Sequence, residues 1–221
     1  MVRSSLNLRP TVTLLGSMTL DGKIATRTGD SKISSLTDLK ALHLVRSRND
    51  ALMIGIGTLL CDNPRLTVRL VKGKSPIRII IDGSARTPPN SRIFLDKDPG
   101  VIVAVTERAS KKRVDKLQQA GAKVIRTGKD QVNLRALLTR LHHLGIRRIL
   151  LEGGGKLNWS MLSNGLEDNI RITIAPIVIG GKRATTLVDC EGVAKISHGI
   201  KLMPVSMRRQ GKEIVISYKV R

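Results

Sequence analysis

Aromatic residues are almost missing from this chain of 221 residues, which has one Trp, one Tyr and one Phe. Proteins that read unpaired nucleic acid commonly stack the bases on aromatic rings, so a stacking platform of that kind is nearly excluded. The hydrophobic fraction is nevertheless 41%. We therefore expect a core of Ile, Leu, Val, Ala and Met side chains, in a chain long enough for one large domain or two small ones.

Cysteine pairs, metal motifs and long apolar runs are also lacking. Cys61 and Cys190 lie far apart and form no Cys-x-x-Cys motif, which fits a reducing cytosol. The four histidines show no metal-ligand spacing. His142 and His143 are adjacent on a predicted helix and cannot both face one ion, so no metal site is expected. No segment is predicted to span a membrane or to act as a signal peptide, and we expect a cytoplasmic protein.

Acidic residues are outnumbered, because 39 Lys and Arg against 17 Asp and Glu give a net charge of +22. Such an excess favours the binding of anions. The partner could be a nucleic acid or a small ligand that carries phosphate. The longest unbroken basic run is only Lys111–Arg113, whereas nucleic-acid-binding tails usually carry denser blocks. A phosphorylated small molecule is therefore the favoured partner.

Strands and helices are predicted to alternate through most of the chain. Apolar, β-branched runs predict strands over 11–18, 51–57, 77–82, 100–105, 123–126 and 148–151. Helices are predicted over 36–48, where Leu39, Leu42 and Val45 would form the apolar face, and over 109–120, 134–144 and 156–163. The pattern then changes to a strand over 170–179, interrupted by Pro176, and a hairpin of 200–207 with 213–220.

This order of elements predicts an α/β fold. We expect a mostly parallel central sheet, antiparallel C-terminal strands and helices on both faces. No linker and no internal repeat interrupt the pattern, so the prediction is a single domain over residues 1–221.

The segment LLEGGGKLNW (150–159) is the strongest candidate for a phosphate-binding loop. It fails the Walker A pattern, because Leu157 stands where Ser or Thr is needed. It also fails the Rossmann fingerprint, because Asn158 stands where the third glycine is needed. A strand that ends in glycines before a helix still offers unpaired backbone N–H groups and a positive helix end to an anion. Lys156 adds a formal charge.

Four segments together resemble the reductase family of riboflavin biosynthesis. They are SMTLDGKIA (17–25), GIGTLLCDNPRLTVR (55–69), IRIIIDGS (77–84) and LLEGGGKLNWSML (150–162), with IAPIVIGG (174–181) as a fifth. The family includes stand-alone archaeal and fungal enzymes and the reductase half of the bacterial bifunctional deaminase–reductase. The resemblance covers nearly the whole chain, and no deaminase zinc motif is present, so this chain resembles the stand-alone form.

The resemblance implies a dihydrofolate-reductase-like fold and a homodimer. It implies a nicotinamide cofactor, normally NADPH, with NADH possible. The implied reaction reduces the ribosyl side chain of 2,5-diamino-6-ribosylamino-4(3H)-pyrimidinone 5′-phosphate to the ribityl form. This sequence departs from many bacterial members in having Ile33 where they have Trp.

The resemblance also implies site residues. On the cofactor side these are Ser17, Thr58, Asp62, Gly83, Gly153, Gly154, Gly155, Lys156, Leu157 and Asn158. On the substrate side they are Ser31, Arg46, Leu66, Arg69 and Glu152.

Several of these residue types suit the chemistry. The opened sugar ring needs a proton, and Lys23 and Glu152 are the candidates to supply it or to orient the sugar hydroxyls. Arg46 and Arg69 could clamp the 5′-phosphate, because a guanidinium binds phosphate oxygens in pairs. Glu152 should point away from the glycine loop, where its charge would repel a pyrophosphate. The 2′-phosphate of NADPH would need a basic contact near Ser84 and Arg86.

Two alternatives stay open at this point. One is a reductase on the same fold that acts on a pterin or a folate. The other is a basic nucleic-acid-binding protein, which would bind a DNA duplex with an affinity that falls steeply as salt rises.

Overall fold

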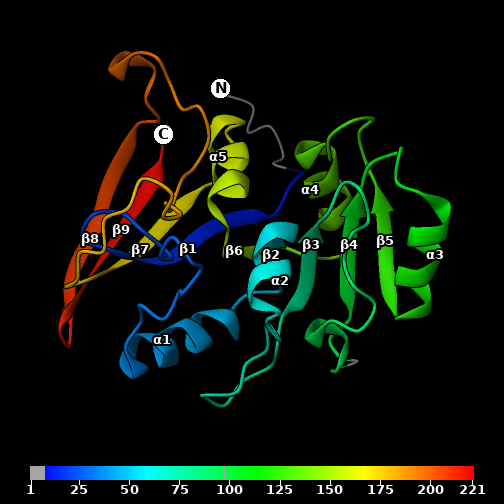
Figure 1. The fold of residues 1–221 in the computed structure, drawn as a ribbon, viewed down its shortest axis with the longest axis horizontal. Coiled ribbons are helices and arrows are strands. Elements are labelled where there is room, and N and C mark those ends of the chain that lie inside the picture. Colours follow the sequence, from blue (N-terminus) through cyan, green and yellow to red (C-terminus); the bar gives the residue numbers. More distant parts are fainter. Residues whose placement is uncertain (1–7, 97) are drawn as a thin grey trace, which may run out of the picture.

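The computed structural model describes residues 8–96 and 98–221, and within them the strands form one nine-stranded sheet (Figure 1). The strands are β1 (Thr11–Thr19), β2 (Ala51–Gly55), β3 (Ile77–Ile81), β4 (Val101–Val105), β5 (Ala122–Arg126), β6 (Arg148–Leu151), β7 (Asn169–Ala175), β8 (Leu202–Gln210) and β9 (Glu213–Val220). The helices are α1 (Leu36–Arg46), α2 (Ile56–Asp62), α3 (Lys111–Gln119), α4 (Leu134–His143) and α5 (Gly155–Ser163), with 3-10 turns at Arg92–Phe94 and Ile196–His198.

The sheet has the order β5-β4-β3-β2-β6-β1-β7-β9-β8. All pairings from β5 to β7 are parallel, and β9 pairs antiparallel with both β7 and β8. The predicted mostly parallel sheet with antiparallel C-terminal strands is thus confirmed. Because parallel strands end at the same edge, the segments that follow β1, β2, β3 and β6 meet along one carboxyl edge.

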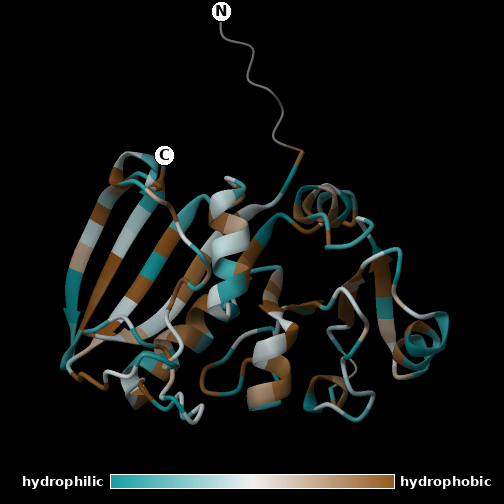
Figure 2. Cartoon of the chain, turned by 45° about the horizontal axis from the view of Figure 1, so that its top comes forward, coloured by the Kyte–Doolittle hydropathy of each residue, from teal (hydrophilic) through white to brown (hydrophobic). Residues whose placement is uncertain are grey.

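Apolar side chains cover both faces of the sheet, as predicted. Along β2, Ala51 and Met53 join the core cluster that contains residues of α4 and α5. Leu52 and Ile54 alternate with them and join the cluster that contains residues of α2 and α3. Figure 2 shows that hydrophobic positions predominate along the central strands.

The predicted strand over 51–57 is too long by two residues. The last residues of β2 with ladder partners are Met53 on the β6 side and Gly55 on the β3 side. Beyond Gly55 the backbone has no neighbouring strand to bond, and it turns into α2 instead. Asn63 ends this helix in the left-handed conformation, with φ of 40°, directly before Pro64.

The predicted bounds of the strands near the C-terminus also differ from those in the structure. Strand β7 ends at Ala175, before Pro176, which cannot donate to a ladder. The hairpin strands β8 and β9 leave only Gly211 and Lys212 as the turn, and Gly211 takes the positive φ of 63° that such a tight turn requires.

Helix α1 corrects the prediction for 36–48 in a more important way. It ends at Arg46, and its buried residues are Asp38, His43 and Arg46, whereas Leu42 and Val45 on the predicted face are half-buried. Leu39, predicted on the buried face, is 36% exposed. The helix packs a polar face against the protein because Asp38 and Arg46 have polar partners there. Ser17 and Thr173 bind Asp38, and Glu152 binds Arg46.

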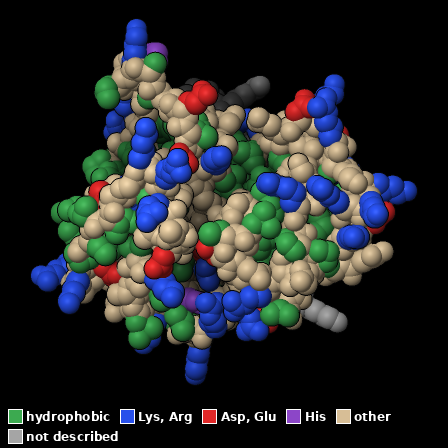
Figure 3. Space-filling view, viewed as in Figure 1, with side chains coloured by type: hydrophobic (Ala, Val, Ile, Leu, Met, Phe, Trp, Pro, Cys, Tyr) green, Lys and Arg blue, Asp and Glu red, His purple; other side chains and the backbone are tan. Residues whose placement is uncertain are grey.

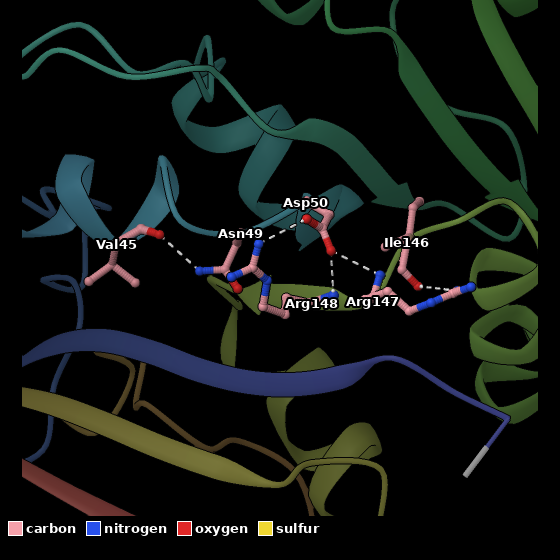
Figure 4. A network of polar contacts seen from close by, with 6 residues as sticks. All are labelled: Val45, Asn49, Asp50, Ile146, Arg147 and Arg148. Atoms are coloured by element: carbon pink, nitrogen blue, oxygen red, sulfur yellow. Dashed lines mark hydrogen bonds and ion pairs between the residues drawn. The ribbon is translucent and has the colours of Figure 1, made fainter. Parts of the chain in front are cut away.

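The amino edge of the sheet is held by carboxylates (Figure 4). Asp50 Oδ2 accepts the backbone N–H groups of Arg147 and Arg148 at 2.9 and 2.8 Å, which ties the start of β6 to the start of β2. Burial alone would raise the pKa of Asp50, but these N–H groups and the Arg148 guanidinium lower it. Asp168 repeats the arrangement at β1, where Oδ2 accepts the Val12 N–H at 2.7 Å and both oxygens bind Arg9 at 2.8 Å.

Within residues 8–96 and 98–221, no helix has the length and hydropathy needed to cross a membrane. No group of three or more His, Cys, Asp and Glu side chains lies there in a position to hold a metal ion.

Candidate active site

A cavity of about 690 Å³ opens at the carboxyl edge of the sheet. Its walls come from the ends of β1, β2 and β6, from the first turns of α2 and α5, and from residues 185–189. Ten of the residues proposed from the sequence line it: Ser17, Ser31, Thr58, Asp62, Glu152, Gly154, Gly155, Lys156, Leu157 and Asn158. Segments far apart in the sequence thus meet at one place.

The glycine loop begins by tying two strands together. Gly153 has a φ of +89°, a conformation that favours glycine, and a Cβ there would lie 3.3 Å from Asn158 Nδ2. Its carbonyl oxygen accepts the Gly55 N–H at 2.8 Å, and the Gly153–Gly154 peptide bond is cis. Gly153 itself is buried behind the cavity wall.

The third glycine permits close packing against a distant segment. A Cβ on Gly155 would lie 2.6 Å from the Thr186 carbonyl oxygen and 2.7 Å from Asp189 Cβ. The Gly155 carbonyl accepts the Asp189 N–H at 3.2 Å, and Asn158 Nδ2 donates to the Leu187 carbonyl at 2.7 Å. The segment 185–189 therefore covers the start of α5 and closes one side of the cavity.

The start of α5 has the features of an anion site. Its N-cap is Gly154, which has no side chain to bond the N–H groups of the first turn. Gly155, Lys156 and Leu157, whose N–H groups have no carbonyl one turn earlier, all line the cavity. A Cβ on Gly154 would lie 3.2 Å from Thr58 Oγ1, so any side chain there would fill the space beside the loop. These residues fit a phosphate group.

Glu152, which directly precedes the three glycines, forms a buried ion pair with Arg46. Arg46 Nε and Nη2 donate to the two carboxylate oxygens of Glu152 at 2.7 and 2.6 Å, and the side chains are 9% and 12% exposed. Burial would lower the pKa of Arg46, but the Glu152 carboxylate raises it above its usual range. The Glu152 carboxylate is thus held by Arg46, while Glu152 also lines the cavity.

Arg46 does not itself line the cavity. Its third nitrogen, Nη1, donates to the Thr67 carbonyl at 3.3 Å. The Arg46 guanidinium, which the sequence suggested as a phosphate clamp, therefore makes its shortest hydrogen bonds to Glu152.

His43 was not among the residues proposed from the sequence, although it lies three residues before Arg46 on α1. It is buried, and its Nδ1 accepts the Arg69 backbone N–H at 3.0 Å. Burial and the charges of Arg46 and Arg69 lower the pKa of His43 to about 4, against a smaller opposing effect of Glu152. His43 is therefore neutral at physiological pH and positions the start of the Arg69 segment. The Arg69 side chain is exposed. The pKa of Arg69 is lowered, mainly by partial burial and to a smaller extent by the charges of Arg46, Arg92 and Arg65.

Three further proposed residues do not line this cavity. Leu66 is buried in the core cluster that contains Leu52. Lys23 pairs with Thr186 in an isolated β-bridge, next to Ile24, which does line the cavity. Gly83 lines a neighbouring cavity of about 920 Å³. The two cavities share Ile81 and Ser160, so they adjoin at the end of β3.

The parallel sheet, the cavity at its carboxyl edge and the glycine turn before α5 define an α/β protein with a dihydrofolate-reductase-like fold. Residues 10–216 match the family model described as the RibD C-terminal domain, and the chain belongs to this family.

Two curated relatives match over nearly their full lengths. The chain is 46% identical to the 2,5-diamino-6-ribosylamino-4(3H)-pyrimidinone 5′-phosphate reductase of Methanothermobacter thermautotrophicus, over 97% of this chain and 100% of that protein. It is 36% identical to the protein of the same name in Aquifex aeolicus, over 96% and 97%. Among solved structures, RibD of Acinetobacter baumannii superimposes with a TM-score of 0.81 at 22% identity, over 97% of this chain and 59% of that one.

Proposed function

We propose that this protein is a stand-alone reductase of riboflavin biosynthesis. It reduces the ribosyl side chain of 2,5-diamino-6-ribosylamino-4(3H)-pyrimidinone 5′-phosphate to the ribityl form with NADPH. The observation that carries the proposal is the cavity that joins an anion-binding helix start to the Glu152–Arg46 pair. The names of the relatives at 46% and 36% identity support the substrate.

The start of α5 would hold the pyrophosphate of the cofactor. Gly155, Lys156 and Leu157 would donate backbone N–H groups, and the Lys156 ammonium would add a charge. Thr58, whose hydroxyl lies beside Gly154, would contribute that hydroxyl. The nicotinamide ring, when bound, supplies the hydride. The role of the protein is to align ring and sugar and to exclude water, which the covering segment 185–189 supports.

The adjoining cavity beyond Ile81 and Ser160 would take the far end of the dinucleotide, beside Gly83. Arg86 supports NADPH over NADH. It lines the main cavity and also a smaller one of about 300 Å³, together with Arg113 and Lys116. Three cations at one place suit the extra 2′-phosphate of NADPH. Exchanging Arg86 for Gln should weaken NADPH binding and leave NADH binding unchanged.

Glu152 would orient the sugar hydroxyls and assist proton transfer to the opened ring oxygen. Arg46 holds both carboxylate oxygens, so it would fix the direction from which Glu152 meets the sugar. Lys23 remains the second candidate for the proton. Arg69 is exposed and free of acidic partners among the described contacts, which supports a role for it in binding the 5′-phosphate. Ser31, which lines the cavity, would contribute its hydroxyl.

The positive charge would assist the capture of both anionic ligands. The net charge is +22, and Figure 3 shows Lys and Arg side chains spread over most of the visible face. A field of this sign raises the local concentration of phosphorylated molecules.

The test is an assay of NADPH oxidation by absorbance. The protein should oxidise NADPH when the ribosylaminopyrimidinone phosphate is added, and should leave NADPH intact with dihydrofolate or a dihydropterin. A protein that binds NADPH but never oxidises it with the ribosyl substrate would contradict the proposal.

We further propose that the chain works in the cytoplasm as a single reductase domain, assembled as a homodimer. Several apolar side chains on and near the edge strand β8 are exposed, including Met207 at 74% and Val205 at 57%. A second copy could cover them. Sedimentation equilibrium should give twice the monomer mass.

A further inference from the structure

A hydrogen-bond network connects the cavity wall at Ser17 to the interior of the protein. Ser17 Oγ donates to Asp38 Oδ2 at 2.6 Å. The other oxygen of the same carboxylate, Oδ1, accepts from Thr173 Oγ1 at 2.8 Å and from Gln210 Nε2 at 3.1 Å. Asp38 is only 5% exposed, and Ser35 Oγ accepts its backbone N–H at 3.1 Å at the start of α1. Four segments thus fix this carboxylate in place.

The network determines which kind of atom Ser17 can bind in the cavity. A carboxylate has only lone pairs, so each of its partners must donate a hydrogen bond to it. A serine hydroxyl has a single proton, and Ser17 uses that proton on Asp38. The oxygen therefore has only lone pairs left for the cavity. A ligand atom that contacts Ser17 must be a donor.

The surroundings of Ser17 suit a flat ring. Leu15, Ile24 and Leu187 line the same cavity as Ser17. Gly16 lies close to Leu187, whose Cδ1 would be 2.9 Å from a Cβ at position 16. Strand β1 is the direct neighbour of β6, after which the glycine loop follows. A dinucleotide with its pyrophosphate at the start of α5 would place its nicotinamide end over β1.

We propose that Asp38 is a positioning residue that holds Ser17 as an obligate hydrogen-bond acceptor, and that Ser17 thereby recognises the carboxamide N–H₂ of the nicotinamide ring. The carboxamide is the donor group that the ring carries. This inference rests on the proposed function, because it requires a nicotinamide cofactor in the cavity.

The experiment compares NADPH with its 3-acetylpyridine analogue, in which a methyl ketone replaces the carboxamide and removes the donor. Binding of each is measured by calorimetry without the second substrate. The wild-type protein should prefer NADPH by about tenfold, the value of one hydrogen bond. Ser17→Ala should reduce this preference to nearly onefold.

Asp38→Asn is the decisive variant. The new amide can donate to the Ser17 oxygen, which frees the serine proton to bond the ketone oxygen of the analogue. The preference for NADPH should fall by about tenfold. Adding Asp38→Asn to Ser17→Ala should change the preference no further. Thr173→Val is the matched control, because it removes one hydrogen bond from the opposite carboxylate oxygen. It should lower the melting temperature and keep the preference.

The possible failures are distinguishable. A wild-type protein that binds neither nucleotide contradicts the proposed function. A wild-type protein that binds both equally, or an Asp38→Asn protein that is folded by circular dichroism and keeps the wild-type preference, overturns the inference alone. If Asp38→Asn does not fold, an unchanged preference in Ser17→Ala still overturns it.

Discussion

The two edges of the parallel sheet differ in whether side chains accept hydrogen bonds from the backbone N–H groups found there. At the amino edge, the carboxylates of Asp50 and Asp168 accept the first N–H groups of β6 and β1 and also bind an arginine each. At the carboxyl edge, the N-cap of α5 is Gly154, which offers its first turn no side-chain acceptor. The comparison indicates that one edge is closed for stability and the other is left open for a ligand.

The largest effect on activity is expected from Glu152→Gln at the open edge. The change removes the charge that neutralises buried Arg46 and loosens the group that would orient the sugar. Turnover should fall by about a hundredfold, or about 2.7 kcal/mol in the barrier. The cofactor Kd should stay within about twofold, because both carboxylate oxygens are bound by Arg46. Steady-state kinetics and cofactor titration measure the two effects, and equal turnover would remove Glu152 from the chemistry.

The second prediction concerns pH and Glu167, near the amino edge. Glu167 is 3% exposed, and neither carboxylate oxygen has a hydrogen-bond partner among the described residues. Burial, and to a smaller extent Asp168, raises the pKa of Glu167 from 4.5 to about 8. The folded protein therefore holds a proton that the unfolded chain releases. The contribution of protonated Glu167 to the free energy of unfolding is fully present below pH 4.5 and is lost as the pH rises to about 8.

Urea unfolding at several pH values tests this directly. The loss should approach roughly 1.4 kcal/mol per pH unit between these limits. Glu167→Gln stays neutral, so its stability relative to wild type should increase steadily over the same interval. A difference that does not change with pH would show that Glu167 is ionised in the folded protein.

A smaller effect is expected from Asp168→Asn at the closed edge. The variant weakens two bonds to Arg9 and one to the Val12 N–H. The free energy of unfolding should drop by about 2 kcal/mol, since hydrogen bonds to charged groups contribute about 1.5–3 kcal/mol each and part is retained. Turnover per folded molecule should not change, which makes this carboxylate-to-amide exchange the matched control for Glu152→Gln. Lost turnover in a folded Asp168→Asn protein would contradict the division between the edges.

The smallest effect is expected from Gly154→Val. Its backbone tolerates a side chain, but the new atoms would enter the space beside Thr58 Oγ1. Cofactor affinity should fall about tenfold, or about 1.4 kcal/mol, by blocked approach of the pyrophosphate. Gly100→Val is the control at the amino edge, where a Cβ would meet nothing within 4 Å. Equal cofactor affinity in both variants would mean that the loop is only a turn.

The parts predicted correctly from the sequence are those that local patterns determine. Alternating and continuous apolar runs located the strands, and the strand–glycine–helix order located the glycine turn between β6 and α5. The α1 face was predicted wrongly, because the apolar spacing of Leu39, Leu42 and Val45 carries no information on what lies opposite. In the fold, Ser17 and Thr173 offer donors there, so Asp38 is buried instead.

Contacts between distant segments could not be predicted. Glu152 and Arg46 were each proposed from the sequence, but their pairing joins residues 106 positions apart. The segment 185–189 was missed because it has neither periodicity nor a motif. The sequence feature that reflects this contact is Gly155, because the Thr186 carbonyl leaves no room for a Cβ there.

Amide hydrogen exchange with and without NADPH tests the central claim most directly, because it reads both edges in one experiment. We expect slower exchange at Gly155, Lys156 and Leu157 when NADPH is added, and no change at Val12, Arg147 and Arg148. Protection that appears at the amino edge, with none at the start of α5, would contradict the division into a closed and an open edge.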